Sequence, residues 1–454
     1  MLAAARRLAS EFPQHPQAVP ALTYSAQQAF ELGDGEAAAD AAQQLLTLKP
    51  LGPEPRLTAL TIIGHTAFDR EDFGGAEAAY RDALSLPILT GDKRRRIAER
   101  LAASLYKQGE QRREGGDRDG AVAAFLLAAQ ANPHSSAAEP GIAATAQFDA
   151  AAVLIELERW PEAIEALETF RQRFPKHPQQ PEVTRRLAAA YLAAGRTEAA
   201  AHAYLQVADE AATPELRRAA LWQAAELYRQ AGLSNAARAG FVRYVEEFPA
   251  PLGQRVEATQ QLLELALETG DQRAARRWRQ AIVDADAKAG PERTERTRFL
   301  AAQAVLALAE EPHRAYQRIK LVEPLQTSLR SKQRAFKRTL AAYERAAGYK
   351  VAAVTTAASY AIATLYADFA KALLESERPA ELKGEALAEY EVLLEEQALP
   401  FEDKAIEIHA INAGRAAEGL YDDWIRKSFD ALAELAPARY AKTERSDGFV
   451  ETLY

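Results

Sequence analysis

The residues that could perform catalysis form only weak patterns in this 454-residue sequence. None of its seven histidines belongs to the helical His-Glu-x-x-His arrangement with which metalloproteases bind zinc. Cysteine is absent, which excludes thiolate metal sites, thiol nucleophiles and disulfides, and no glycine-rich phosphate loop or Gly-x-Ser-x-Gly segment occurs. Carboxylate pairs such as Glu246–Glu247 and Glu395–Glu396 fall on expected helix surfaces, where solvation explains them better than acid–base catalysis. We therefore expect no enzyme, no cofactor and no metal site.

One dipeptide is shared with a class of enzyme. Lytic transglycosylases have long helical regions followed by a catalytic domain that opens on Glu-Ser, and the segment LLESERP supplies Glu375 and Ser376. No Gly-Leu-Met-Gln type of segment follows them, so the dipeptide does not indicate this activity. A helical region of such an enzyme without its catalytic domain is kept as a minor alternative.

Basic residues gather in three places. They are Lys93-Arg94-Arg95-Arg96, the arginines around Trp278, and a run from Arg330 to Arg338. Basic clusters with an aromatic residue can bind nucleic acid or an acidic peptide. Acidic residues are interleaved, as Glu268 and Asp271 are near Trp278, and the whole chain has a net charge of -8. We interpret the clusters as solvated helix faces and expect no nucleic-acid partner.

The elements that carry these residues recur at intervals of about forty residues. The segment LWQAAELYRQAGLSNAARAGFVRYVEEFP, from Leu221 to Pro249, orders small, aromatic, glycine, small, aromatic and proline residues along two helices. Proline and glycine fall between apolar-periodic stretches, and no alternating strand pattern appears. Six copies can be placed, at about 19–52, 57–90, 102–135, 144–177, 181–214 and 218–251.

This order of residues resembles the tetratricopeptide repeat, a helical hairpin of about 34 residues. The resemblance implies an all-α fold, a right-handed superhelix or solenoid whose grooves bind other proteins. We expect residues 1–254 to form this solenoid and residues 255–454 to form a degenerate region with longer helices. Residues 1–14 resemble the second helix of a hairpin, which suggests a piece of a longer repeat protein.

Within the C-terminal region, two features are predicted. A segment after residue 299 reads as a degenerate hairpin broken at Pro312 and Pro324. The stretch KVAAVTTAASYAIATLYADFAKALLES, by its helical spacing of alanine and tyrosine, predicts one long amphipathic helix.

The resemblance implies that the first helix of each hairpin lines a concave surface that binds a peptide or helix of a protein partner. Aromatic and arginine residues are typical anchors of such interfaces, with packing between repeats as the alternative role. No adjacent pair of repeats carries the Lys/Asn/Arg set with which some family members hold a terminal carboxylate. The predicted partner-binding residues are His65, Phe68, Tyr106, Arg185, Trp222, Glu226 and Arg229.

Hairpin endings of the Phe-Pro-x-His-Pro kind resemble repeat proteins of the Gram-negative cell envelope, and residues 395–445 resemble large periplasmic repeat proteins that accompany ExbB/TolQ-type or gliding systems. The resemblance implies a scaffold of a periplasmic complex, with a cytoplasmic adaptor or regulator as the alternative. No apolar run is long enough for a membrane helix, so we expect no direct membrane insertion.

Overall fold

The computed structural model describes residues 2–131 and 141–441. Over these residues every regular element is helical, as the sequence predicts, and the chain is an all-α repeat protein. Its contacts divide it into two compact units, Met1–Ala237 (unit 1) and Arg238–Tyr454 (unit 2). The division expected at residues 254 and 255 stays a prediction.

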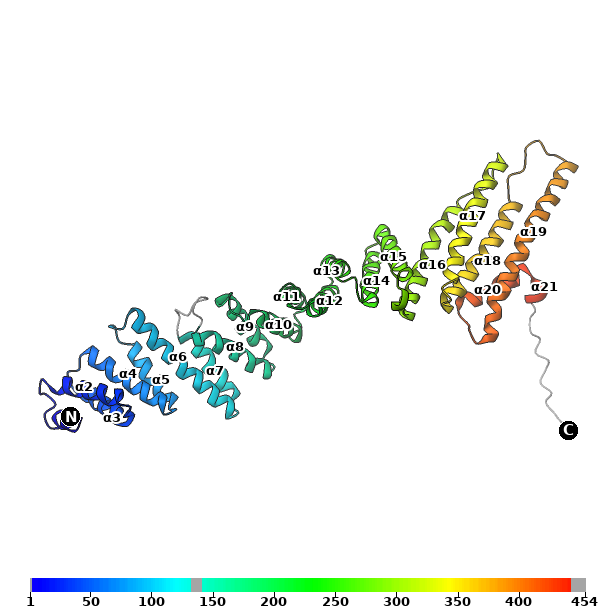
Figure 1. Cartoon of the computed structure of the whole chain (residues 1–454). Coiled ribbons are helices and arrows are strands. Elements are labelled where there is room, and N and C mark those ends of the chain that lie inside the picture. Colours follow the sequence, from blue (N-terminus) through cyan, green and yellow to red (C-terminus); the bar gives the residue numbers. More distant parts are fainter. Residues whose placement is uncertain (1, 132–140, 442–454) are drawn as a thin grey trace, which may run out of the picture. The chain divides into compact units, whose positions relative to one another are not determined.

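Unit 1 begins with α1 (Leu2–Glu11) and continues as antiparallel hairpins in which each helix packs on the next (Figure 1). Each predicted copy covers two consecutive helices; residues 132–135 of the third copy lie outside the described residues. The helices of the hairpins are α2 Ala18–Glu31, α3 Gly35–Thr47, α4 Pro53–Asp69, α5 Phe73–Leu84, α6 Gly91–Glu114, α7 Arg118–Ala131, α8 Gly141–Glu156, α9 Trp160–Arg173, α10 Gln180–Ala193 and α11 Thr197–Glu210. Helix α12 (Pro214–Gln230) packs on α11, and α13 (Ser234–Glu247) crosses from unit 1 into unit 2.

The same turn closes the first helix of every hairpin. One residue with positive φ, such as Gly33 at 80° or Gly116 at 84°, reverses the chain, and glycine adopts this conformation without steric cost. In several copies the next residue is an aspartate that caps the second helix, as Asp34 accepts a hydrogen bond of 3.0 Å from the Ala37 amide. The turn residue and the capping aspartate, which are neighbours in the sequence, thus determine where these hairpins reverse.

Small residues face aromatic rings where the two helices of a hairpin cross. Tyr80 on α5 and Phe125 on α7 are completely buried, and each ring lies against a glycine of the preceding helix, Gly64 and Gly109. A Cβ atom at Gly109 would lie 2.5 Å from Cε1 and 2.6 Å from Cδ1 of Phe125. The absence of a side chain at these positions is therefore what permits the crossing.

We expect Gly109→Ala to lower the free energy of unfolding by about 1–3 kcal/mol, because the new Cβ atom forces the completely buried Phe125 ring to shift. The better helix propensity of alanine, about 1 kcal/mol, offsets only part of this loss. Gly35→Ala in the same unit is the matched control, since its nearest contact would be an ordinary 3.7 Å to Cγ2 of Thr66. Urea unfolding measures both, and an equal stability of the two variants would contradict the packing argument.

Unit 2 keeps one further hairpin and then changes to longer helices. The hairpin α14–α15 has the same turn, with Gly270 at a φ of 72°. Four long helices, α16 to α19, follow and pack side by side in chain order (Figure 1). The elements after α13 are α14 Leu252–Glu268, α15 Gln272–Ala287, the 3-10 turn η1 Gly290–Glu292, α16 Glu295–Gln317, α17 Leu325–Ala347, α18 Ala352–Leu374, α19 Glu385–Gly414, the 3-10 turn η2 Arg415–Glu418, α20 Asp423–Leu435 and α21 Pro437–Tyr440.

The two predictions for this region had different outcomes. The long helix expected after Lys350 is present as α18. The break expected at Pro312 is wrong, because α16 runs through this proline to Gln317. Burial of Ala309 and Tyr316 on either side holds the helix together, which offsets the hydrogen bond that proline removes. At Pro324 the expected break is confirmed, since α17 starts after it.

Candidate functional site

A cavity of about 510 Å³ opens on the first helices of three successive hairpins in unit 1. We call it the α2–α4–α6 groove. Its lining combines aliphatic and aromatic side chains with charged ones, as expected of a binding surface. The lining residues are Gln27, Phe30 and Glu31 of α2; Glu54, Leu57, Thr58, Thr61, Ile62 and His65 of α4; Leu89; and Lys93, Arg96, Ile97 and Arg100 of α6.

Helical spacing places these side chains on one face of each helix. On α4 the lining residues recur every three or four positions from Glu54 to His65, and on α6 from Lys93 to Arg100. Residues three and four apart share a helix face. The first helices therefore line a groove here, as the repeat pattern predicts.

His65 lies at the centre of the aromatic part of the groove. Its ring stacks on Phe30 of α2 with a centroid separation of 5.7 Å, and its Nδ1 is 2.6 Å from the hydroxyl of Tyr80. Burial, and then the charge of Arg100, lowers the pKa of His65. Burial also raises the pKa of Tyr80 to about 12. Both side chains are thus neutral at neutral pH. His65 lines the groove, and the buried Tyr80 holds it from behind by the hydrogen bond.

Three other predicted residues are engaged in contacts within the protein. The Phe68 ring packs edge-on against Phe73, at 5.1 Å between centroids. The Tyr106 hydroxyl donates a hydrogen bond of 2.7 Å to the carboxylate of Asp149, which ties α6 to α8. Arg185 is exposed and pairs with the neighbouring Glu182. Partner binding by these residues stays a prediction.

The last three predicted residues, Trp222, Glu226 and Arg229, share one face of α12 and are each half-buried. Their spacing of three to four residues brings them together on that face. None of them lines the α2–α4–α6 groove. Their role in binding also stays a prediction.

A family model identifies the hairpins. The model of the tetratricopeptide repeat matches residues 103–135 and 145–177, which correspond to the third and fourth copies placed from the sequence. This chain contains tetratricopeptide repeats. No curated protein matches the sequence.

Solved structures similar to this chain include another tetratricopeptide repeat protein. The structure of Naa15/Naa10 bound to HypK-THB is 15% identical and covers 92% of this chain and 64% of that one, with a TM-score of 0.31. A tetratricopeptide repeat protein from Parabacteroides merdae is 15% identical and covers 63% of this chain and 99% of that one, with a TM-score of 0.26. Pseudomonas aeruginosa pilF is 15% identical and covers 52% of this chain and 94% of that one, with a TM-score of 0.23. The repeat protein thus spans less than two thirds of the length of the first of these structures.

Sequence reasoning missed most of the groove. Phe30, Arg96 and Arg100 line it, whereas the composition of the run Lys93–Arg96 indicates only a solvated helix face. The signal that separates its members is helical spacing, because residues 93, 96, 97 and 100 share a face while 94 and 95 point elsewhere. Arg94, for example, donates a hydrogen bond of 2.9 Å to the Leu84 carbonyl oxygen.

Other clusters singled out from the sequence make structural contacts. The Arg277 guanidinium lies 4.4 Å from the centre of the Trp278 ring, and Arg276 pairs with Glu311 of α16 at 2.9 Å. Ser376 of the Glu-Ser dipeptide is buried in the turn after α18, where Arg378 binds its carbonyl oxygen. Among the described residues of the repeat protein, no group of three or more acidic or histidine side chains is placed to hold a metal ion. Along the same residues, no helix combines the length and apolar character needed to cross a membrane.

Proposed function

We propose that this repeat protein is a non-catalytic scaffold that binds partner proteins, and that the α2–α4–α6 groove is one of its binding surfaces. The observation that supports this proposal is a cavity of about 510 Å³ built by the first helices of three hairpins and lined by both apolar and charged side chains. Solenoids of this kind present such concave surfaces to partners. Apolar anchors in a groove supply most of the affinity of an interface.

We further propose that the partners belong to a cell-envelope complex in the periplasm. Support comes from the Phe-Pro hairpin endings, such as those at Phe174 and Phe248, and from the resemblance of residues 395–445 to periplasmic repeat proteins. A cytoplasmic adaptor that uses the same groove is the alternative.

Filling the groove tests the binding proposal. In Thr61→Trp a large ring occupies the cavity, at the cost of the local hydrogen bond from the Thr61 hydroxyl to the Leu57 carbonyl oxygen. We expect covalent cross-linking in intact cells to recover partners from the wild type and about tenfold less from this variant. Thr47→Trp is the matched control, because Thr47 is exposed at the end of α3, away from the groove.

The cross-linking experiment also addresses the compartment, and a separate zymogram addresses catalysis. Recovery of cytosolic proteins alone would overturn the periplasmic proposal. Unchanged recovery with Thr61→Trp would overturn the groove as the binding surface. Cleavage of peptidoglycan by the purified chain in a zymogram would contradict a purely non-catalytic scaffold.

A further inference from the structure

The α6 wall of the groove carries three cations on one helix face. Lys93, Arg96 and Arg100 recur at spacings of three and four residues, and all three are exposed and line the cavity. Ile97 lies between them and is 8% exposed, so the wall alternates positive charge with apolar surface.

These three side chains make no hydrogen bond or ion pair within the part of the chain that the structure describes. Their neighbours differ: Arg95 pairs with Asp92 at 3.5 Å, and Arg94 binds the Leu84 carbonyl oxygen at 2.9 Å. In the run of four basic residues, Arg94 and Arg95 therefore make contacts within the protein, whereas Lys93 and Arg96 face the groove. An arginine that binds a carboxylate of a partner forms strong, directional hydrogen bonds with it.

The apolar and acidic residues of the groove lining restrict which kind of anionic partner can bind there. The aliphatic part of the lining, which we call the floor, consists of Leu57, Ile62 and Leu89, and the lining also includes the stacked rings of Phe30 and His65. Two carboxylates, Glu31 and Glu54, line the cavity from α2 and from the start of α4. A uniform polyanion such as nucleic acid would place phosphates against these two glutamates and leave the apolar floor unused. A peptide with separate acidic and apolar side chains satisfies both.

We propose that the α2–α4–α6 groove binds a partner segment that combines acidic side chains with an apolar or aromatic one. The carboxylates lie against Arg96 and Arg100, and the apolar side chain lies on the floor formed by Leu57 and Ile62. This inference rests on the proposed function of the groove and names the chemistry of its occupant.

The test uses the whole chain and a library of random peptides displayed on phage. Peptides are selected on the wild type and depleted on Thr61→Trp, so that only groove binders remain. We expect enrichment of sequences with Asp or Glu close to Phe, Leu or Trp. Enrichment of basic or uncharged sequences, or no enrichment, would overturn the proposal.

The binding constant of the most enriched peptide then tests the basic wall. The double variant Arg96→Glu/Arg100→Glu should weaken binding by about tenfold or more, because it places like charges face to face. Arg94→Glu/Arg95→Glu makes the same change of charge on the same helix outside the cavity lining and should change binding by less than about threefold. Circular dichroism verifies that both variants are folded, which the exposure of these four side chains favours.

The outcomes separate the inference from the function on which it rests. Equal effects of the two double variants would refute the acidic occupant. If Thr61→Trp still loses its cellular partners in that case, the groove remains a binding surface. A single-stranded oligonucleotide that binds the wild type more tightly than the selected peptide, and loses affinity in Arg96→Glu/Arg100→Glu, would assign the wall to nucleic acid instead.

Discussion

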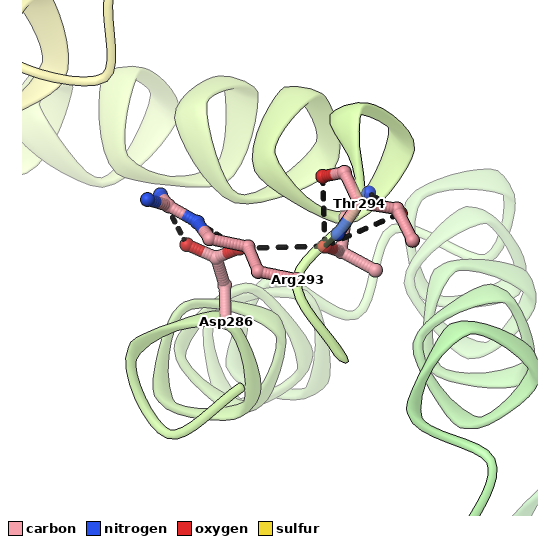
Figure 2. Close-up of polar contacts among 4 residues, drawn as sticks. Asp286, Arg293 and Thr294 are labelled. Carbon is pink, nitrogen blue, oxygen red and sulfur yellow. Dashed lines mark hydrogen bonds and ion pairs between the residues drawn. The ribbon is translucent and has the colours of Figure 1, made fainter. Parts of the chain in front are cut away.

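Replacing Arg293 by alanine is expected to lower the free energy of unfolding by about 3 kcal/mol or more. The reason is the carboxylate of Asp286 on α15, whose side chain is only 2% exposed. Arg293 holds it with two hydrogen bonds, from Nε to Oδ1 at 3.0 Å and from Nη2 to Oδ2 at 2.8 Å. Figure 2 shows this pair beside Thr294, which caps α16. Without the guanidinium, a buried negative charge has no counter-ion.

The pair also fixes the connection between α15 and α16. Thr294 and Thr297 exchange hydrogen bonds between side chain and backbone, at 3.1 Å and 3.0 Å, and so start α16. The Thr297 hydroxyl in addition lies 3.5 Å from Oδ1 of Asp286. Loss of Arg293 therefore disturbs both the buried charge and the cap beside it.

Arg296→Ala is the matched control, because it removes an ion pair one turn away that is more exposed. Arg296 binds Glu257 at 2.7 Å, with the two side chains 56% and 32% exposed. Such a pair contributes about 1 kcal/mol or less. Urea unfolding should give Arg293→Ala a much lower free energy of unfolding than Arg296→Ala. Equal losses of stability in the two variants would show that the Asp286 carboxylate is not held as described.

A double variant separates charge from packing. Asp286→Asn with Arg293→Ala removes the buried charge as well as its partner. We expect it to recover part of the stability lost in Arg293→Ala, since the remaining amide carries no uncompensated charge. Further loss in the double variant would contradict this account.

The hairpins could be predicted from sequence because everything that makes them is local. A turn residue such as Gly232 and a small–aromatic pair such as Gly109 and Phe125 lie within one segment of about forty residues. The continuation of α16 through Pro312 could not be predicted in this way, because burial by residues of other helices outweighs the local preference of proline.

The groove was harder to predict than the hairpins. His65 was identified and lines the cavity, whereas Tyr106, on the equivalent first helix, bonds to Asp149 of the next hairpin. Whether an aromatic residue on a first helix faces the cavity or the neighbouring helix depends on the packing between hairpins, which one repeat does not encode. The basic residues of α6 carried a usable signal, since the spacing of Lys93, Arg96 and Arg100 already placed them on one face.

Acidification is expected to loosen the last helices of unit 2 through His409. This residue of α19 is 1% exposed, and its Nδ1 lies 3.3 Å from the hydroxyl of Ser428 on α20. Burial lowers the pKa of His409 to about 4, from an ordinary value of 6.5. The folded state therefore holds this ring neutral where the unfolded chain protonates it.

Among the residues that the structure describes, no carboxylate bonds to the His409 ring. Its ring packs against Tyr360 of α18, at 5.5 Å between centroids, and Tyr360 in turn contacts Trp424. The charged groups of this region make other contacts: Arg415 with Ser359, Lys427 with the rings of Trp424 and Tyr360, and Asp422 with the hydroxyl of Thr356. Protonation thus places a charge among apolar and neutral groups.

The sign and the pH window follow from the two pKa values. Well above pH 6.5 the ring is neutral in both the folded and the unfolded state, and the stability is not reduced by this group. Between pH 6.5 and about 4 the unfolded state binds the proton more readily, so stability falls as the pH falls. The loss is on the order of 2 kcal/mol at pH 5 and 3 kcal/mol at pH 4.

His409→Gln removes the titration while keeping a side chain that can bond to Ser428. Hydrogen exchange of α19 and α20, with exposure times scaled to the intrinsic rate at each pH, should show protection falling between pH 7 and pH 5 in the wild type and much less in the variant. The comparison with the variant is needed because burial lowers the pKa of His65 and His313 as well. An equal loss of protection in His409→Gln would place the sensitivity at another group.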